Sequence, residues 1–411
     1  MKKLLIIGYV WPEPASSAAG TRMMQLIDFF LKENYQVHFS TTATRTAYAP
    51  ALENLGIITK VIELNSPSFD SYIEDLQPDI VLFDRFMMEE QFSWRVDKFC
   101  PAALKILDTE DLHFIRKARH TAYKENKNPK ELYLSSEIAK REIASIYRSD
   151  LSLIISEVEM QLLSGEFNIP ESLLFYLPFM MKEITSEEID TLSGFNDRKD
   201  FISIGNFLHD PNRNAVFILK EKIWPVIRKQ LPQANLHIYG AYPSEKIFKL
   251  NDPKTGFLVH GRADNAEEEM KKARICLAPL QFGAGLKGKL IQAMQCGTPA
   301  VTSEVGAEGI PGDLPWNGFI ENDPEKFSAA AVKLYQDESE WKTAQICGFQ
   351  IINSRFSEEI FQKEFQRKLQ LIDRLHEHRE KNFIGAMLRH HLHRSTYFMS
   401  RFIEEKNKTA G

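Results

Sequence analysis

Short, fully apolar runs recur along the first half of the chain and alternate with stretches of helical periodicity. The apolar runs lie at residues 4–10, 37–41, 61–64, 80–83, 104–107, 151–155 and 173–177. Between the first two, residues 20–32 repeat apolar side chains at helical spacing. Strands that are apolar throughout are buried on both faces, as in a parallel sheet covered by helices on both sides. This pattern therefore predicts an α/β fold built from successive strand–helix units.

A second series of the same kind begins near residue 201. Its apolar runs lie at 201–204, 236–239, 257–259, 275–278, 300–302 and 318–320, with helical patterns at 212–230 and 324–336. We predict an N-terminal domain at 1–180, a polar linker at 181–200, a C-terminal domain at 201–352 and a helical remainder at 353–411. Within that remainder, an apolar stripe from Phe361 to Leu375 indicates a one-faced helix.

Charge and cysteine content exclude several classes of protein. The chain carries 51 Lys and Arg against 56 Asp and Glu, a net charge of −5 that gives no overall attraction to nucleic acid. Its four cysteines are far apart and form no CxxC pair, which argues against a disulfide scaffold or a zinc knuckle. The apolar N-terminal run is broken at Gly8 and is too short for a secretory leader. We expect a cytoplasmic protein.

Ligands of open α/β sheets bind beyond the carboxyl ends of the strands, so the loops after strands are the places to search. The first such loop, 11–22, consists largely of small residues and leads into a helix. Backbone N–H groups at a helix N-terminus suit a phosphate. The same composition also fits a loop that is kept small for packing, and both interpretations stay open.

A second loop, 279–290, is rich in glycine and carries Lys287 and Lys289. Residues 283–289 satisfy GxxxxGK, but Leu290 stands where a P-loop needs Ser or Thr to bind magnesium. What remains is a flexible turn with two ammonium groups before a helix. Such a turn can stabilise a departing diphosphate. The alternative is two solvated surface lysines.

Several blocks in the second half carry a family resemblance when read in order. They are 204–207 (IGNF), 236–240 (LHIYG), 259–262 (VHGR), 283–289 (GAGLKGK), 292–301 (QAMQCGTPAV) and 306–309 (GAEG). Together they resemble the nucleotide-sugar-binding domain of GT-B glycosyltransferases of family 4, also called group 1. The resemblance implies two Rossmann-like parallel-sheet domains facing a cleft, the first on the acceptor side, followed by a helix that crosses back to the first domain.

The resemblance also implies a reaction. Family members transfer a sugar from a nucleotide diphosphate to an acceptor hydroxyl with retention at the anomeric carbon, and they require no metal. The absence of an Asp-X-Asp pair in this chain agrees with that expectation. No other cofactor is expected. The acceptor would be a glycan, a lipid-linked sugar or another precursor of a cell-surface polysaccharide.

Site residues follow by matching motifs. Lys289 matches the family's diphosphate lysine, Lys287 the basic residue two places earlier, and Gly20 the first-domain glycine that closes over the phosphates. The nucleotide base would lie near Gly261 and Arg262. The other candidates for donor binding are Gly205, Asn206, Gly283, Ala284, Gly285, Leu286 and Gln292.

Two positions depart from the family pattern. Gln292 stands where members usually carry a glutamate that holds the donor ribose, and a neutral amide makes weaker hydrogen bonds there. Ala284 replaces a second glutamate that contacts the donor sugar in many members. These departures motivate an alternative function, a catalytically silent nucleotide-sugar-binding module. A sugar-nucleotide epimerase is a further, weaker alternative.

The loop that follows the strand at 104–107 supplies candidates on the acceptor side. Asp108, Glu110 and His113 are suited to orienting an acceptor hydroxyl or taking its proton. Helix capping and solvation are the structural alternatives for these side chains.

The tail at 379–411 combines basic residues with an apolar face. It could contact an anionic membrane, or it could pack on the first domain or in a dimer. The sequence does not determine the oligomeric state.

Overall fold

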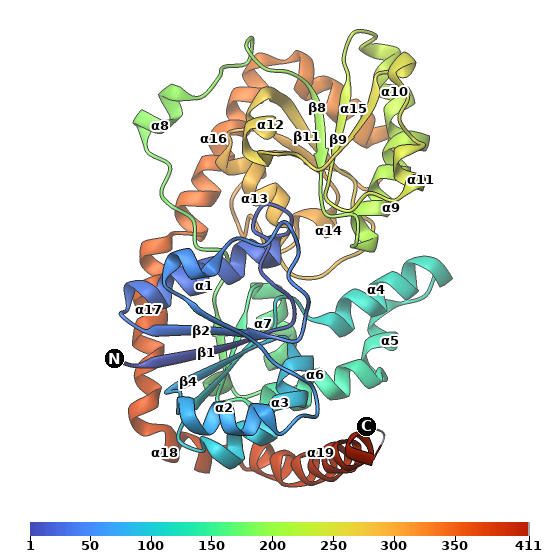
Figure 1. Ribbon diagram of the computed structural model, residues 1–411. Coiled ribbons are helices and arrows are strands. Elements are labelled where there is room, and N and C mark those ends of the chain that lie inside the picture. The colour runs from blue at the N-terminus through green and yellow to red at the C-terminus, as the bar shows by residue number, and fades with distance from the viewer. Residues whose placement is uncertain (410–411) are drawn as a thin grey trace.

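The computed structural model describes residues 1–409 and has two parallel α/β domains, one above the other in Figure 1. The first domain holds a seven-stranded sheet in the order β3-β2-β1-β4-β5-β6-β7, and every pairing is parallel. Its strands are β1 (Lys3–Gly8), β2 (Gln36–Thr41), β3 (Ile58–Val61), β4 (Ile80–Asp84), β5 (Leu104–Asp108), β6 (Leu151–Ile154) and β7 (Leu174–Tyr176).

Helices cover both faces of this sheet. They are α1 (Ala18–Lys32), α2 (Ser68–Leu76), α3 (Phe86–Phe99), α4 (His113–Glu125), α5 (Pro129–Leu134), α6 (Glu137–Arg148) and α7 (Glu157–Gly165), with 3-10 turns at Leu52–Leu55 and Glu171–Leu173. Burial on both faces explains the apolar run of β1. Leu5 and Ile7 belong to one hydrophobic cluster, whereas Leu4 and Ile6 belong to the cluster on the opposite face.

The second domain repeats the plan with six parallel strands in the order β10-β9-β8-β11-β12-β13. These are β8 (Lys199–Ile204), β9 (Leu236–Tyr239), β10 (Phe257–Gly261), β11 (Ala273–Ala278), β12 (Ala300–Thr302) and β13 (Gly318–Ile320). Its helices are α9 (Asp210–Ile218), a π-helical turn (Leu219–Ile223), α10 (Trp224–Gln230), α11 (Glu245–Phe248), a 3-10 turn (Pro253–Thr255), α12 (Ala266–Lys272), α13 (Gly288–Gln295), α14 (Glu304–Ala307), α15 (Pro324–Gln336) and α16 (Glu338–Arg355). The predicted α/β architecture with two parallel sheets is confirmed.

The segment predicted as a linker contains a short helix, α8 (Ser186–Thr191), and its last residues already belong to β8. Thr185 and Glu188 form a reciprocal capping box that fixes the start of α8. The chain passes back from the second domain beside this segment, where the backbone N–H of Met181 donates to the carbonyl of Phe356. The two crossings therefore lie side by side.

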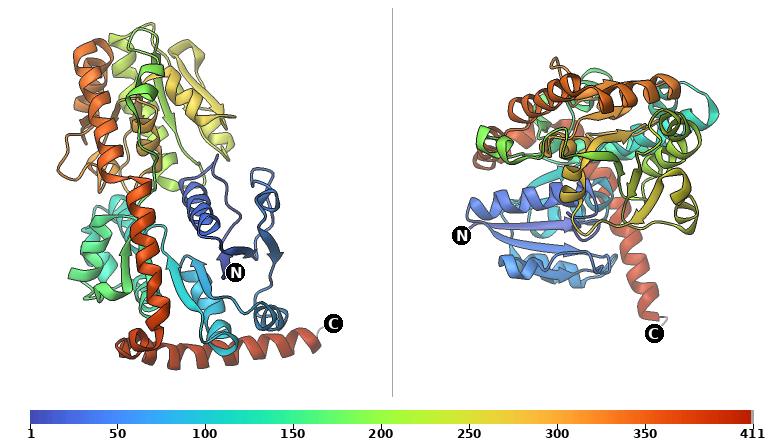
Figure 2. Two further views of the ribbon diagram at one scale, coloured as in Figure 1. Left: turned by 90° about the vertical axis from the view of Figure 1, so that its left-hand side faces the viewer. Right: turned by 90° about the horizontal axis from the view of Figure 1, so that it is seen from above.

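Four helical segments complete the chain: α17 (Glu358–Leu369), a 3-10 turn (Gln370–Arg374), α18 (Leu375–Glu380) and α19 (Phe383–Thr409). Phe365 of α17 is fully buried in the first domain, with its ring 4.8 Å from that of Phe29 and 5.6 Å from that of Phe175. The helix α19 lies across the end of the first domain that faces away from the second domain (Figure 2). The last two residues of the predicted tail, 410 and 411, lie outside the described residues. No helix in residues 1–409 is both long and apolar enough to cross a membrane.

The strand order places the functional loops. In each sheet the direction of strand succession reverses at the first strand, between β1 and β4 and between β8 and β11. At such a point the loops after neighbouring strands diverge and leave a crevice. The loops after β1 and β4 of the first domain and after β8 and β11 of the second therefore lie between the two domains, and the loop after β5 lies beside them.

Candidate functional site

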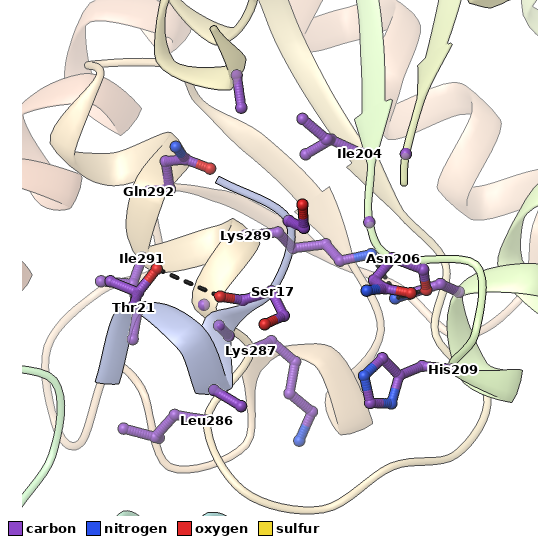
Figure 3. Close-up of a pocket in the computed structure, with 18 of the residues that line it drawn as sticks. Ser17, Thr21, Ile204, Asn206, His209, Leu286, Lys287, Lys289, Ile291 and Gln292 are labelled. Carbon is purple, nitrogen blue, oxygen red and sulfur yellow. Dashed lines mark hydrogen bonds between the residues drawn. The ribbon is translucent and has the colours of Figure 1, made fainter. Parts of the chain in front are cut away.

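A cavity of about 470 Å³ lies between the two domains. The first domain contributes residues 14–19 before and at the start of α1, together with Glu110 and Asp111 after β5. The second domain contributes residues 204–206 after β8, residues 262–267 and the glycine-rich segment 282–289. Figure 3 shows some of the lining side chains, among them Ser17, Asn206, Lys287 and Lys289.

The N-termini of two helices, α1 and α13, meet at the cavity. Ser17 caps α1, and its Oγ accepts a hydrogen bond of 3.0 Å from the backbone N–H of Gly20. Gly288 is the first residue of α13, and a Cβ at this position would lie 2.7 Å from the Cβ of Ala18. Glycine at 288 therefore allows the two helix ends to approach. Free N–H groups and the positive ends of both helix dipoles favour an anion here.

Lys289 extends from the first turn of α13 toward the loop after β8, as Figure 3 shows. Its Nζ donates a hydrogen bond of 2.6 Å to Oδ1 of Asn212. A Cβ at Gly205 would lie 2.7 Å from this Nζ, so the side chain reaches its position because residue 205 is a glycine. Burial lowers the pKa of Lys289 to about 8, because an ammonium ion loses its hydration there.

Lys287 is even less exposed, at 8% of its surface. Its Nζ donates a hydrogen bond of 2.7 Å to the carbonyl of Gly285. Burial lowers the pKa of Lys287 to about 8 as well, against the opposing influence of the Glu308 carboxylate. An anion bound in the cavity would raise both pKa values again and hold the two lysines in their charged form.

Two further polar side chains beside the lysines escaped the sequence analysis. His209 lines the cavity at the N-terminus of α9, and Asn212 in the first turn of the same helix also lines it. Burial and the nearby Arg116 lower the pKa of His209 to about 4, so its imidazole is neutral at physiological pH and can both donate and accept hydrogen bonds. The polar run that follows β8 at 205–214 was the signal for these residues.

The three predicted acceptor-side residues separate in the structure. Of Asp108, Glu110 and His113, only Glu110 lines the cavity. Asp108 is fully buried and accepts a hydrogen bond of 2.9 Å from Nε of Arg22, so it has a structural partner and no access to a ligand. His113 lies behind the cavity wall, with Nδ1 3.4 Å from a carboxylate oxygen of Glu142. The sequence located the loop but did not identify which side chain faces the cleft.

Backbone strain marks the same wall. Glu110 has φ = 64° and Arg85, another lining residue, has φ = 71°, both in the left-handed region that non-glycine residues rarely adopt. Burial, and next the proximity of Asp108, raise the pKa of Glu110 well above its usual value. Strain of this kind persists where the surrounding structure fixes a functional conformation.

Most of the predicted donor-binding residues line the cavity, and two do not. Those that do are Gly205, Asn206, Arg262, Gly283, Ala284, Gly285, Leu286 and Gln292, besides Lys287 and Lys289. Gly20 is the third residue of α1, where a Cβ would approach the backbone of Glu13 to 2.4 Å, so this glycine serves the packing of the loop. Gly261 lies outside the lining and adopts φ = 79° at the end of β10. Ligand contact at these two glycines stays a prediction.

Several buried polar atoms at the cavity have no hydrogen-bond partner within the described part of the chain. They are Oγ of Ser16, Oδ1 of Asp111 and Nε of Arg262. Buried polar groups are almost always hydrogen-bonded, so orphaned atoms on a cavity wall mark places for a polar ligand. Arg262 also stacks on the ring of Tyr48 from the first domain, with Cζ 4.5 Å from the ring centroid.

Side chains of the first domain hold the glycine-rich segment from outside the cavity. Glu159 on α7 accepts a hydrogen bond of 2.8 Å from the backbone N–H of Gly285. Arg119 on α4 donates to the carbonyl of Gly283 at 2.9 Å and forms an ion pair with Glu308. No sequence motif predicts these contacts, because residues from distant parts of the chain form them. Among the side chains that the structure describes, His, Cys, Asp and Glu form no cluster of three that could hold a metal.

The sequence of the second domain matches a known protein family. Residues 198–337, which span the second domain and its cavity wall, match the family model described as "Glycosyl transferases group 1". The second domain belongs to the group 1 glycosyltransferases. No curated protein sequence is similar enough to the whole chain to count as a relative.

Solved glycosyltransferase structures have the same two-domain fold, and the group 1 domain is therefore part of a GT-B architecture. Sucrose-phosphate synthase from Thermosynechococcus elongatus superposes with a TM-score of 0.66 at 14% identity, covering 91% of this chain and 100% of the other. A variant of S. aureus TarM, solved with fondaparinux, alpha-GlcNAc-glycerol and UDP, gives 0.68 at 10% identity and covers 90% of this chain and 99% of its own. HepE of Anabaena, in complex with UDP and glucose, gives 0.67 at 12% identity and covers 90% and 100%.

Proposed function

We propose that this group 1 glycosyltransferase transfers a sugar from a nucleotide diphosphate to an acceptor hydroxyl, with retention at the anomeric carbon and without a metal ion. One observation carries the proposal. Lys287, Lys289 and the N-termini of α1 and α13 converge on a single cavity between two α/β domains. That constellation suits the charge of a diphosphate, which grows as the sugar departs.

The donor is oriented by this charge. Its diphosphate lies at the N-terminus of α13, with Lys289 and Lys287 as the cations. Its ribose points toward Gln292 and its base toward Arg262, both of which line the same cavity. The two ammonium groups supply the positive charge that a metal ion would otherwise bring to a leaving diphosphate.

The reaction breaks the bond between the anomeric carbon and the diphosphate oxygen. A bond from the acceptor oxygen to the same face of that carbon replaces it, which preserves the anomeric configuration, and the proton of the acceptor hydroxyl passes to the departing diphosphate oxygen on that face. Glu110 and Asp111 both place carboxyl groups on the first-domain wall of the cavity, and Glu110 orients the acceptor through a hydrogen bond with its hydroxyl group. We propose a glycan or another polysaccharide precursor as the acceptor.

The experiment combines binding with product analysis. The full chain is screened with a panel of nucleotide sugars for thermal stabilisation, uridine donors first because the TarM and HepE structures hold UDP. Stabilising donors are then incubated with acceptor mixtures, with and without a chelator. We expect release of the nucleoside diphosphate with the chelator present, and a product whose anomeric configuration by NMR matches the donor.

A silent binding module is the second candidate, and Gln292 and Ala284 favour it because the resemblance implies glutamates at both positions. Donor binding without release of nucleoside diphosphate, over the whole acceptor panel, would support this candidate and contradict transfer. An inverted product would contradict retention, and loss of turnover with the chelator would contradict a metal-independent reaction. Conversion of the donor into an epimer would contradict both candidates.

A further inference from the structure

We propose that the outward face of α19 is a docking surface for an anionic membrane, with the helix lying in the plane of the lipid headgroups. This surface is remote from the cavity, and the proposal does not depend on the proposed reaction. It rests on how α19 is anchored, on what its outward face carries, and on the charge beside that face.

The inner face of α19 is anchored by buried charge. Glu404 forms an ion pair with Arg95 of α3 at 2.7 Å, and each side chain is 2% exposed. Arg95 also donates to Oγ of Ser400 at 2.9 Å. Breaking a buried ion pair of this kind is costly, so α19 has a fixed rotation about its axis.

The N-terminal end of the helix is fixed as well. Asn382 donates to the carbonyl of Tyr147 at 2.7 Å, and a Cβ at Gly385 would lie 2.1 Å from the same carbonyl oxygen. Arg389 donates to the carbonyl of Arg148 at 3.0 Å. Because these contacts anchor one face of α19, the side chains on the opposite face point toward solvent.

That opposite face is apolar at both ends. Phe383, Met387, Phe398 and Phe402 are spaced by 4, 11 and 4 residues, which places them on one side of a helix. The exposed fractions of Phe398 and Phe402 are 67% and 65%. Ile384 and Met399 beside them are also exposed. Aromatic side chains gathered in this way mark an interaction surface.

The middle of the face is basic. Arg394 is exposed between the two apolar ends, beside the exposed His391, and Lys381 is exposed two residues before Phe383. Arg401 is exposed near Phe398 and pairs with Glu404 at 2.6 Å. A helix with aromatic residues among cations on its free side is typical of one that lies in a membrane interface. Each cation near an anionic lipid surface adds attraction that salt weakens.

This charge distinguishes a membrane from a second copy of the chain. A symmetric dimer through α19 would bring the same face of two helices together, so both copies would bring Arg394 into one interface. Like charges in an interface oppose association. An anionic lipid surface would attract the cations of this face, and its acyl chains would bury the phenyl rings. It therefore matches both the charge and the apolar character of the face.

The geometry of the molecule permits this docking. Figures 1 and 2 both place α19 at the far end of the first domain, away from the second domain and from the cleft. In the side view of Figure 2 the helix runs across that end as one straight segment. A molecule resting on α19 would hold its second domain away from the lipid.

Sedimentation with lipid vesicles tests the proposal on the full chain. We expect binding to vesicles of phosphatidylglycerol and phosphatidylcholine, much weaker binding to phosphatidylcholine alone, and a loss of binding at high salt. The double substitution Phe398→Asp and Phe402→Asp should lower the partition coefficient at least tenfold, and Arg394→Glu should lower it several-fold. The matched controls are Ile346→Asp and Lys342→Glu on α16, which also change an exposed apolar and an exposed basic residue of a helix.

Two further measurements test whether the variants fold and whether α19 contacts the lipid. The melting temperature of each variant shows whether it folds. Phe402→Trp should gain fluorescence quenching by brominated lipid, whereas Ile346→Trp should not. Failure of the wild-type chain to bind anionic vesicles, or equal loss in the α16 controls, would overturn the proposal. So would a dimer in analytical ultracentrifugation that Phe398→Asp dissociates, because the face would then bind a second copy.

Discussion

Arg119 of the first domain and Glu308 of the second form a bidentate ion pair, with donor–acceptor distances of 2.6 and 2.7 Å. The same guanidinium donates to the carbonyl of Gly283 in the glycine-rich segment. The pair therefore ties the position of that segment, which carries both lysines, to the first domain.

Removing this pair should weaken donor binding without unfolding the chain. Both side chains are about one-quarter exposed, so we expect a coupling energy of about 1 kcal/mol in a double-mutant cycle of Arg119→Met and Glu308→Gln on donor affinity. Isothermal titration with the donor measures it. Arg141→Met, which breaks an exposed pair with Glu90 inside the first domain, is the control. Additive effects of the two substitutions would show that the pair does not act as a unit.

Lys289→Ala should lower kcat by a factor of about 10² to 10³, because it removes a cation that stabilises charge on the leaving diphosphate. Release of nucleoside diphosphate gives the rate, and circular dichroism verifies the fold. Lys272→Ala serves as the control, since this lysine is 66% exposed on α12. Turnover close to that of the wild type would remove Lys289 from the proposed machinery.

Donor affinity should fall as the pH rises above 8. Burial lowers the pKa values of Lys287 and Lys289 to about 8, so both lose their charge above that pH in the free protein. A bound diphosphate needs the charged form of each lysine. Above pH 8, deprotonation of each lysine should therefore lower the donor affinity about tenfold for every pH unit. Lys289→Arg should make the dependence shallower because a guanidinium keeps its proton. An affinity that stays constant from pH 7 to 10 would contradict this assignment.

Asp108 and Glu110 should respond differently when an amide replaces the carboxyl group. Asp108→Asn leaves the buried Arg22 without its ionic partner and should cost about 3 to 5 kcal/mol of stability. Glu110→Gln should leave the melting temperature unchanged and lower kcat by a factor of about 10². Thermal unfolding and initial rates on both variants give the comparison. If Glu110→Gln were fully active, acceptor orientation would need another group.

Gly288→Ala should weaken donor binding by separating the ends of α1 and α13. The added Cβ would lie 2.7 Å from the Cβ of Ala18, which is closer than two non-bonded carbon atoms can approach. Ala18→Gly in the same chain removes the clash and should restore affinity. Rescue by the double variant, measured with the same donor, distinguishes this contact from a general loss of stability. If the single variant bound as tightly as the wild type, close approach of the helices would not matter for the site.

Apolar runs and helical spacing were sufficient to predict two parallel sheets, since strands such as β1 are buried on both faces and leave few alternatives. The glycine and lysine pattern at 283–289 likewise predicted the segment that lines the cavity. Both features depend on residues close together in the chain, which is why sequence alone determined them.

The tertiary structure decided which side chains face the cleft. Asp108 and Glu110 are two residues apart, but only the backbone conformation after β5 turns Glu110 into the cavity and leaves Asp108 with Arg22. Contacts such as Arg119 with Glu308 join residues 189 positions apart. For the basic, apolar tail the sequence favoured packing over contact with a membrane, but only the pair of Glu404 with Arg95 fixed which face of α19 packs and which is exposed. Long-range packing sets these orientations, and no local pattern in the sequence records them.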